Sequence, residues 1–206
     1  MLVSIEGIDG AGKNTLVGRL RQELDIEVDV LAFPRYETSI HAQLAREALY
    51  GRMGDLTDSI YAMATLFALD RHGAKEQLAS AATDTGRLLL LDRYVASNAA
   101  YSAARAQDEA VVDWVYALEY ERLGLPVPDL QIYLDTAVNV AAERAASRAE
   151  ADAARARDRY EQDGGLQART AAAYRELARR QWAGRWIATT DVDMIIQSVK
   201  DLVGEK

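Results

Sequence analysis

A glycine-rich segment close to the N-terminus has the residue types and spacing that bind nucleotide phosphates. Residues 7–15 read GIDGAGKNT, in which four residues separate two glycines and a lysine follows the second. Glycines let successive backbone amides point inward, and the start of a following helix adds its own N–H groups. Lys13 can neutralise the β- and γ-phosphate oxygens during transfer, which makes it a catalytic candidate. We expect phosphate binding by Gly7, Gly10, Ala11, Gly12, Lys13, Asn14 and Thr15.

Two side chains of this segment depart from the usual pattern, and both concern Mg²⁺. Asn14 stands where a hydroxyl normally coordinates the metal, and Thr15 points about 100° around the helix. We therefore expect phosphates, waters and nearby carboxylates to hold Mg²⁺. Asp9 would either bind the metal or accept a hydrogen bond from a sugar hydroxyl of the acceptor. The structural alternatives are a surface aspartate and an ordinary lysine on a glycine-rich turn.

An aspartate and an arginine end the third strand-like run. Leu88–Leu91 leads directly into Asp92 and Arg93. Ligands bind at the carboxyl edge of an open parallel sheet, so both side chains would face the nucleotide. Asp92 is a candidate Mg²⁺ ligand through water, and the guanidinium fork of Arg93 suits the oxygens of two phosphates. This run is a weak signal alone, but with the glycine-rich segment it indicates phosphoryl transfer.

The surplus of arginines favours a phosphate as the acceptor over a nucleoside hydroxyl. A phosphate oxygen is already ionised near neutral pH, so transfer to it needs cations and no general base. Arg35, Arg71, Arg93 and the arginines near 148–159 could supply that charge. Phe67 lies four residues before Arg71 on one predicted helix face, where a ring could stack on a base. A core phenylalanine beside a surface arginine is the alternative that spacing alone favours.

Arginines also crowd a low-complexity segment rich in alanine, 141–160. Arg144, Arg148, Arg155 and Arg159 would line one face of a single helix, and Arg157, Tyr160 and Glu161 accompany them. Composition alone favours a solvated helix whose arginines are balanced by Glu143, Glu150, Asp152 and Asp158. The other interpretation is a set of cations that closes over bound phosphates, with Glu161 as a further candidate metal ligand.

Short apolar runs alternate with helical patterns along the chain, which predicts a parallel, doubly wound α/β sheet. The runs are apolar throughout, as expected of strands covered on both faces, and they lie at Leu2–Glu6, Val28–Phe33, Leu88–Asp92, Leu130–Leu134 and Trp186–Thr189. The helical patterns lie at Lys13–Leu24, Ile40–Tyr50, Ser59–Ala82, Ser97–Arg105, Asp108–Leu123, Val138–Ala149, Gln167–Gln181 and Val192–Val203. These elements place both phosphate-binding motifs at strand ends.

Composition limits the remaining classes of function. A chain of 206 residues suits one compact domain, 1–206, and its net charge of −8 argues against a nucleic-acid partner. It has no cysteine and only two histidines, His41 and His72, so thiol, histidine–zinc and catalytic-triad chemistry are disfavoured. Without a signal-peptide pattern or a membrane-length apolar run, we expect a cytoplasmic protein that does not bind membranes.

Taken together, the motifs resemble the bacterial thymidylate kinase family, most closely its mycobacterial and actinobacterial members. The resemblance covers nearly the whole chain in order, through EGIDGAGK at 6–13, FPRY at 33–36, LDR at 69–71, DRY at 92–94, SNAAY at 97–101 and GLPVPD at 124–129. It implies a P-loop kinase of the nucleoside-monophosphate type, with a five-stranded parallel sheet and a short arginine-rich lid near 144–161. The implied reaction moves the γ-phosphoryl group of ATP to dTMP with Mg²⁺.

The same resemblance implies roles in binding dTMP. Phe67 would stack on thymine, Arg71 would bond the carbonyl at its edge and Asn98 would read the base. Tyr101 would crowd the sugar 2′ position, while Tyr36 and Arg93 would hold the acceptor phosphate. Asp9 would contact the 3′-hydroxyl or Mg²⁺, and Tyr160 is a further dTMP-binding candidate.

The lid and the quaternary structure follow from the same resemblance. Members with glycine at position 10 carry their catalytic cations in the lid, which here points to Arg155, then Arg148 and Arg157. The Ser59–Ala82 pattern is apolar on more than one face, and the family implies a homodimer. Another nucleoside-monophosphate kinase, a deoxynucleoside kinase and a non-catalytic nucleotide-binding regulator remain the alternatives.

Overall fold

The protein folds around a five-stranded parallel sheet with the order β2-β3-β1-β4-β5. The computed structural model describes residues 1–151 and 159–204, and for residues 148–151 and 161–162 it describes the backbone alone. The strands are β1 Leu2–Glu6, β2 Glu27–Ala32, β3 Arg87–Asp92, β4 Leu130–Tyr133 and β5 Trp186–Ala188. All four pairings are parallel, and the predicted strands are confirmed with ends that differ by at most one residue.

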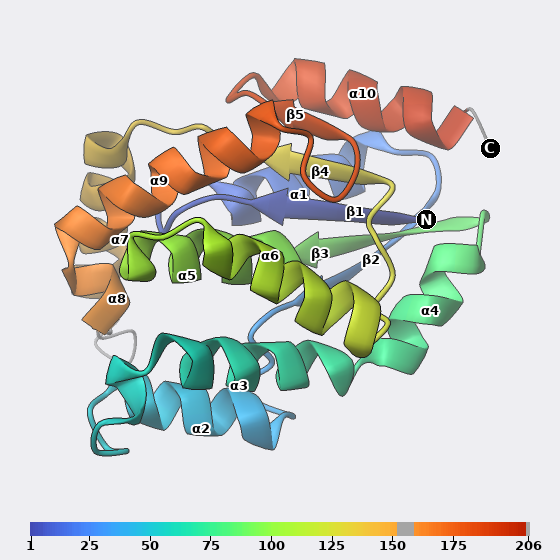
Figure 1. The fold of residues 1–206 in the computed structure, drawn as a ribbon. Coiled ribbons are helices and arrows are strands. Elements are labelled where there is room, and N and C mark those ends of the chain that lie inside the picture. The colour runs from blue at the N-terminus through green and yellow to red at the C-terminus, as the bar shows by residue number, and fades with distance from the viewer. Residues whose placement is uncertain (152–158, 205–206) are drawn as a thin grey trace.

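Helices connect these strands and cover the sheet (Figure 1). They are α1 Lys13–Glu23, α2 Ile40–Leu49, α3 Ile60–His72, α4 Lys75–Thr83, α5 Val95–Ala106, α6 Ala110–Tyr116, α7 Val138–Ala151, α8 Arg159–Gln162, α9 Gly164–Arg179 and α10 Val192–Gly204. Two short segments complete the set, the 3₁₀ turn η1 at Leu56–Asp58 and the π-helical segment η2 at Ala117–Arg122. No helix in the described part of the chain is long and apolar enough to cross a membrane.

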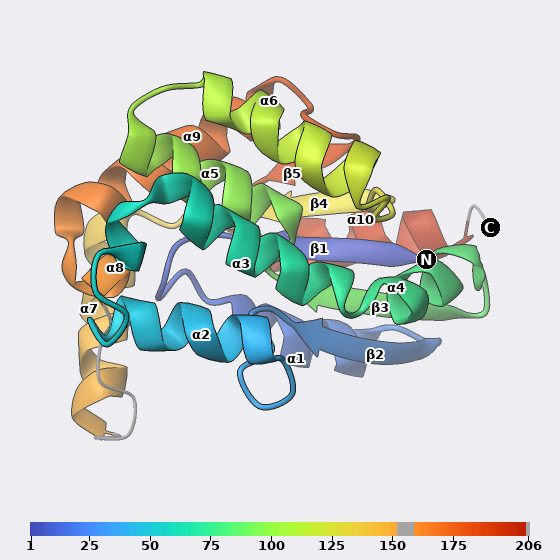
Figure 2. The ribbon, with the colours of Figure 1, turned by 60° about the horizontal axis from the view of Figure 1, so that its bottom comes forward.

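Strand β3, which lies between β2 and β1, shows why the sheet is covered on both faces. Leu88 and Leu90 point into the cluster formed with α1 and α10, whereas Leu89 and Leu91 join the cluster formed with α5, α6 and α9. Side chains alternate along a strand, so a run of four leucines supplies both layers. Figures 1 and 2 show these two helical layers on either side of the strands.

The edge strand β2 departs from the sequence prediction. Its run was expected to be apolar throughout, yet it carries Asp29, and Glu27, Asp29 and Val30 are exposed. β2 pairs with β3 along one side and lies at the end of the strand order, so its side chains are less covered than those of β1. Charged residues on an edge strand also discourage pairing with another chain.

The predicted helix over Ser59–Ala82 is two helices, α3 and α4. The break falls at Gly73 and Ala74, where the Gly73 amide donates to the carbonyl of Leu69 at 3.0 Å. A Cβ on Gly73 would lie 2.7 Å from Nη2 of Arg35, so glycine lets that side chain pass close to the backbone. Glycine also favours a helix end at this position.

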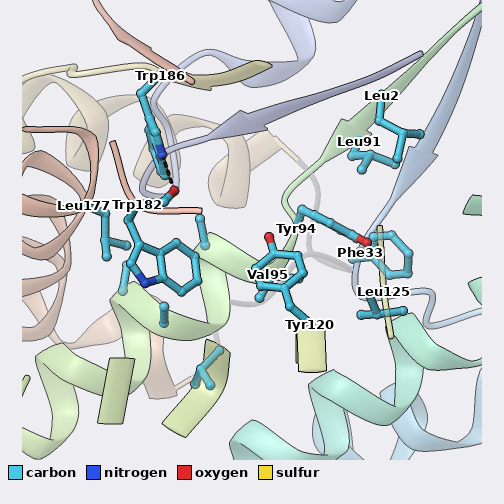
Figure 3. Packing of buried hydrophobic residues seen from close by; sticks show 14 of the residues in the cluster. Leu2, Phe33, Leu91, Tyr94, Val95, Tyr120, Leu125, Leu177, Trp182 and Trp186 are labelled. Carbon is cyan, nitrogen blue, oxygen red and sulfur yellow. Dashed lines mark hydrogen bonds between the residues drawn. The ribbon is translucent and has the colours of Figure 1, made fainter. Parts of the chain in front are cut away.

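The predicted helix over Asp108–Leu123 also has two parts, because α6 continues as the π-helical segment η2. Aromatic contacts hold η2 in place: the Tyr120 ring lies 5.2 Å from Tyr116 and 6.0 Å from Trp182, centroid to centroid. Figure 3 shows Tyr120 and Trp182 in the buried cluster, where the Trp186 indole donates to the Trp182 carbonyl at 2.7 Å. The segment is therefore packed against Trp182, in the turn that follows α9.

Candidate active site

The glycine-rich segment is a loop between the end of β1 and the start of α1. Gly12 adopts φ +103° directly before the helix, and the first turn of α1 carries no acidic residue. The Thr136 hydroxyl donates to the Ala11 carbonyl at 2.9 Å and so fastens the loop to the exit of β4. The exposed amides of a helix N-terminus attract anions. We call residues 7–15 the P-loop from here on.

The side chain of Lys13 folds back onto the first residues of the P-loop. Its Nζ atom donates to the carbonyls of Gly7 and Ile8, at 3.3 Å each. Burial and the nearby charge of Arg93 lower the pKa of Lys13 to about 8, against the opposing effects of Asp9 and Asp92. The side chains of Asn14 and Thr15 are exposed at the start of α1.

Gly10 is in close contact with helix α7. A Cβ built on Gly10 would lie 1.9 Å from the carbonyl oxygen of Ala141, and its φ of +85° also disfavours any other residue. Nη1 of Arg144 lies 3.8 Å from the corresponding position on Gly12. The beginning of α7 therefore reaches the P-loop, and Arg144 is a cation that the choice of catalytic arginines from sequence passed over.

Asp9, Arg93 and Tyr101 form one group at the carboxyl edge of the sheet. Nη2 of Arg93 donates to Oδ1 of Asp9 at 2.6 Å, and the Tyr101 hydroxyl donates to Oδ2 at 3.1 Å. The Arg93 guanidinium also lies over the Tyr101 ring, 5.3 Å from its centroid. The three come from the P-loop, the end of β3 and α5, so the fold joins residues that are far apart in the sequence.

Electrostatics keep this group charged. Burial opposes ionisation of Asp9, but the charges of Arg93 and Lys13 outweigh it and lower the pKa of the carboxyl to about 2. Arg93 itself has φ +67°, a left-handed conformation that is uncommon outside glycine and that turns its side chain at the strand end. Backbone strain of this kind gathers at functional sites.

Asp92 ends β3 beside the same group. The negative charge of its carboxylate favours the protonated, charged forms of both Lys13 and Arg93. Oδ1 of Asp92 is buried and accepts no hydrogen bond among the residues that the structure describes. A buried carboxylate oxygen without a donor is expected to bind water or a cation. Asp92 is therefore the predicted metal ligand whose surroundings fit that role best.

Glu6 is a central residue that the sequence argument did not select. It is buried at the end of β1 and accepts from the Tyr94 amide at 2.9 Å, the Ser97 hydroxyl at 2.7 Å and the Tyr174 hydroxyl at 3.3 Å. Burial raises the pKa of Glu6, while the Ser97 hydroxyl, the charges of Arg93 and Lys13 and the Tyr94 amide oppose that rise. Glu6 therefore ties the P-loop strand to α5 and α9.

Arg71 and Asn98 are brought together, and a third residue joins them. Nε and Nη2 of Arg71 donate to the two carboxylate oxygens of Glu119, at 2.5 and 2.7 Å. Nδ2 of Asn98 donates to Oε1 of Glu119 at 2.7 Å and to the Ala64 carbonyl at 3.0 Å. Arg71, Asn98 and Glu119 are all buried. The sequence offered no signal for Glu119, which resembles any other polar residue on a helix.

Phe67 and Tyr160 both pack against a smaller apolar cluster between α2 and α3. The Tyr160 ring stacks on Tyr101 with centroids 6.2 Å apart, and the Arg105 guanidinium lies 4.9 Å from the Tyr160 centroid. Gln167 donates to the Tyr160 carbonyl at 2.9 Å. Tyr160 is thus joined to the Asp9–Arg93–Tyr101 group through Tyr101.

The loop after β2 reaches the same edge of the sheet. Its Phe33 amide donates to the Asp92 carbonyl at 2.9 Å. Nε of Arg35 pairs with Oδ1 of Asp70 at 3.0 Å, so this arginine is held against α3. The ring of Tyr36 faces Arg46 of α2, 5.4 Å from centroid to guanidinium.

The structure does not describe the side chains of most predicted lid residues. Arg155 and Arg157 fall outside the described residues, and the side chains of Arg148 on α7 and Glu161 on α8 do as well. Arg159 pairs with Asp58 of η1 at 3.7 Å, and both side chains are largely exposed. The catalytic choice among the lid arginines therefore stays a prediction.

Comparisons with known proteins agree with one another. The family model for thymidylate kinase matches residues 5–201. The chain is 51% identical over 200 residues to a protein of Mycobacterium tuberculosis named thymidylate kinase, which covers 94% of this chain and 93% of that protein. A protein of Akkermansia muciniphila with the same name is 36% identical over 170 residues, covering 81% of this chain and 74% of that protein.

A solved structure agrees at the level of the fold. The structure of thymidylate kinase from Candida albicans superimposes with a TM-score of 0.74 and covers 99% of this chain and 91% of that one, at 22% identity. The P-loop, the strand ends and the matches over nearly all of the sequence lead to one conclusion. The chain belongs to the thymidylate kinase family.

Proposed function

We propose that the chain transfers the γ-phosphoryl group of ATP to dTMP, giving dTDP and ADP, as a step in dTTP biosynthesis. The observation that carries this proposal is the position of Arg93. Its guanidinium pairs with Asp9 inside the P-loop and lies against Tyr101 of α5, so it stands between a site for a triphosphate and a site for an acceptor. Family membership supports the same activity.

The described cations are suited to transfer between two anions. An oxygen of the acceptor phosphate attacks the γ-phosphorus as the bond to the β–γ bridging oxygen breaks, and the bonding electrons leave with ADP. Lys13 and the P-loop amides would hold the β- and γ-phosphates, while Arg93 would hold the acceptor phosphate. No general base is required, because the attacking oxygen is already ionised.

The acceptor nucleotide would lie against α3 and α5. Phe67 would stack on thymine, with Arg71 and Asn98 at the edge of the base. Tyr101 would crowd the sugar 2′ position and so favour deoxyribose. Its 3.1 Å contact with Asp9 supports a place for the sugar beside that carboxylate, which would accept from the 3′-hydroxyl. Tyr36 would contact the acceptor phosphate, and Tyr160, stacked on Tyr101, would be a further contact of dTMP.

Mg²⁺ is expected to accompany ATP, and when bound it supplies charge neutralisation on the β- and γ-phosphates. The residues at the site fit such an ion in part. Asp92 would hold it through water, since its Oδ1 atom is buried and accepts no bond from described residues. Asp9 is engaged by Arg93 and Tyr101, which makes it the weaker candidate, and the side chain of Glu161 lies outside the description.

The arginine-rich segment is the proposed lid. Arg144 on α7 supports this role, since it lies beside Gly12 of the P-loop. Arg148, Arg155 and Arg157 would add charge when the lid closes over ATP. Such arginines contribute about 10³–10⁵ in rate where they have been measured.

The protein would act as a homodimer in the cytoplasm. Helix α3 buries Met63 and Ala68 in its own protomer, yet it also exposes Tyr61, whose side chain packs edge-on against Trp114 of α6. Ile40 at the start of the neighbouring α2 is 60% exposed. An exposed apolar surface over α2, α3 and α6 favours burial against a second copy.

The test measures ADP release from ATP and Mg²⁺ with dTMP, dUMP, dCMP, AMP and thymidine in parallel. We expect dTMP to give by far the highest kcat/KM. Equal turnover of AMP would reject the thymine site, turnover of thymidine alone would indicate a deoxynucleoside kinase, and nucleotide binding without turnover would indicate a regulator.

The accompanying variant is Arg93→Ala. We expect it to lose most turnover with dTMP, by about 10³-fold or more, because the acceptor phosphate loses its cation. Arg87→Ala is the matched control, since Arg87 begins the same strand at the opposite edge of the sheet and pairs there with Asp29. Full activity in Arg93→Ala would contradict the assignment.

A further inference from the structure

Glu119 is a buried carboxylate without an assigned role, and it lies between the two residues that would read the base. It belongs to η2, its side chain is fully buried, and it accepts from Arg71 and Asn98 at once. η2 departs from regular α-helix geometry, and π-helical turns are frequent at functional sites. Tyr116 and Tyr120 anchor the segment against Trp182, so the carboxylate has a fixed position.

The contacts of Glu119 decide which atoms Arg71 and Asn98 can offer to a ligand. Nε and Nη2 of Arg71 are both used by the carboxylate. Nδ2 of Asn98 has two hydrogens, and these go to Glu119 and to the Ala64 carbonyl. Both partners are acceptors, so only the nitrogen of the Asn98 amide can face them.

What remains is one donor and one acceptor. The donor group is the guanidinium of Arg71, which keeps both N–H groups of Nη1 and the second of Nη2, and the acceptor is the amide oxygen of Asn98, Oδ1. That oxygen receives one long contact, 3.5 Å from the Ser102 hydroxyl, which leaves a second lone pair for another donor. Without the carboxylate, the Asn98 amide could turn over and present its nitrogen instead.

This pair of groups matches the edge of thymine and opposes that of cytosine. Thymine presents a donor at N3 beside acceptor carbonyls, whereas cytosine presents an acceptor at N3 beside an amino donor. We propose that Glu119 is a positioning residue that fixes the donor of Arg71 and the acceptor of Asn98, and so makes the site select a thymine-type base over cytosine. The inference rests on the proposed function, because it takes Arg71 and Asn98 as the groups that contact the base.

The test substitution is Glu119→Gln, which keeps shape and removes one acceptor. Oε1 of Glu119 accepts from both Arg71 and Asn98, so in either orientation the glutamine amino group faces a donor, and the guanidinium or the Asn98 amide loses its fixed position. We expect the KM for dTMP to rise on the order of tenfold, with the KM for ATP unchanged. The ratio of kcat/KM for dTMP to that for dCMP should fall by about tenfold or more.

This ratio stays informative for a poorly folded variant, since both substrates are compared on the same sample and the active fraction cancels. A ratio within twofold of the parent would overturn the inference. Glu121→Gln is the matched control, because Glu121 is an exposed carboxylate in the same segment. We expect it to leave both KM values and the ratio unchanged.

A combined variant separates positioning from simple support of the fold. If Glu119 acts through Arg71 and Asn98, then Arg71→Ala together with Asn98→Ala should already lose the preference, and adding Glu119→Gln should lower the ratio no further. Independent, additive losses would contradict the inference. If the parent protein does not prefer dTMP to dCMP, both the proposed base contacts and this inference are wrong. If the parent prefers dTMP and Glu119→Gln keeps that preference, only this inference is wrong.

Discussion

At the scale of single residues, the site is governed by pairs of opposite charge that burial makes strong. Asp9 and Arg93 are 2.6 Å apart with little solvent around them. The pKa of Asp9 falls to about 2, so the carboxyl stays charged at neutral pH. Lys13 is the exception, since burial and the charge of Arg93 bring its pKa down to about 8.

ATP affinity should therefore depend on pH above neutrality. Bound phosphates favour the charged form of Lys13, so the protonated protein binds more tightly, and affinity falls as the pH rises through about 8. We expect the Kd for ATP to rise by up to about tenfold per pH unit beyond that point. Calorimetric titration from pH 6.5 to 9.5 measures it.

Lys13→Arg supplies the control for this titration. A guanidinium keeps its charge over the whole range, so any remaining binding should lose its pH dependence. A Kd for the parent protein that stays constant up to pH 9.5 would show that Lys13 does not titrate where its surroundings imply.

At the scale of elements, the close approach of α7 to the P-loop is the contact that links the proposed lid to the phosphate site. It requires glycine at position 10, because the Ala141 carbonyl occupies the space of a side chain. The same carbonyl lies one turn before Arg144, whose Nη1 reaches Gly12. The start of the lid is thus positioned by backbone packing against the loop that it would cover.

Gly10→Ala should separate these two elements. A methyl group at φ +85° costs about 1–2 kcal/mol before the contact with Ala141 is counted, so the free energy of unfolding should fall by at least that much. ATP binding should weaken as well, because the loop must shift. Urea unfolding and an ATP titration measure the two effects.

Gly18→Ala is the matched control for that substitution. Gly18 lies within α1, and a Cβ there would meet nothing within 4 Å. We expect it to raise the free energy of unfolding by about 0.5–1 kcal/mol, since alanine favours helix. Equal effects of the two substitutions would contradict the proposed contact between α7 and the P-loop.

At the scale of the whole molecule, the two sides of the sheet differ in how they meet solvent. α1 and α10 cover one side, whereas on the other side α2 and α3 lie beyond α5, as Figure 2 shows. Tyr61 on α3 and Met194 on α10 are similarly exposed, at 52% and 55%. Only the first belongs to the surface over α2, α3 and α6 that we propose as the dimer interface.

Tyr61→Asp should convert the dimer to monomers. A symmetric interface places the substitution there twice, so two carboxylates must be buried or held apart. Sedimentation velocity should show the mass of one protomer, with unchanged circular dichroism because Tyr61 is exposed in the protomer. Met194→Asp should remain dimeric, and a monomeric parent protein would reject the interface.

The sequence by itself determined the features that arise from neighbouring residues. The P-loop could be predicted because its nine consecutive residues set their own backbone. The positions of Asp92 and Arg93 could be predicted because the leucine run before them is typical of a buried strand. The five strands were predictable for the same reason. The break at Gly73 and the π-helical turn at η2 were not predicted, and the residues that contact them, Arg35 and Trp182, are distant in sequence.

Tertiary structure alone decided which charges meet. Glu119 is 48 residues from Arg71, and Glu6 is 168 residues from Tyr174, so no local pattern marks either carboxylate as buried. In the sequence Glu119 and Glu121 look alike, yet one is fully buried and the other exposed. A side chain's chemistry depends on what surrounds it, and for these residues the surroundings come from packing between elements far apart along the chain.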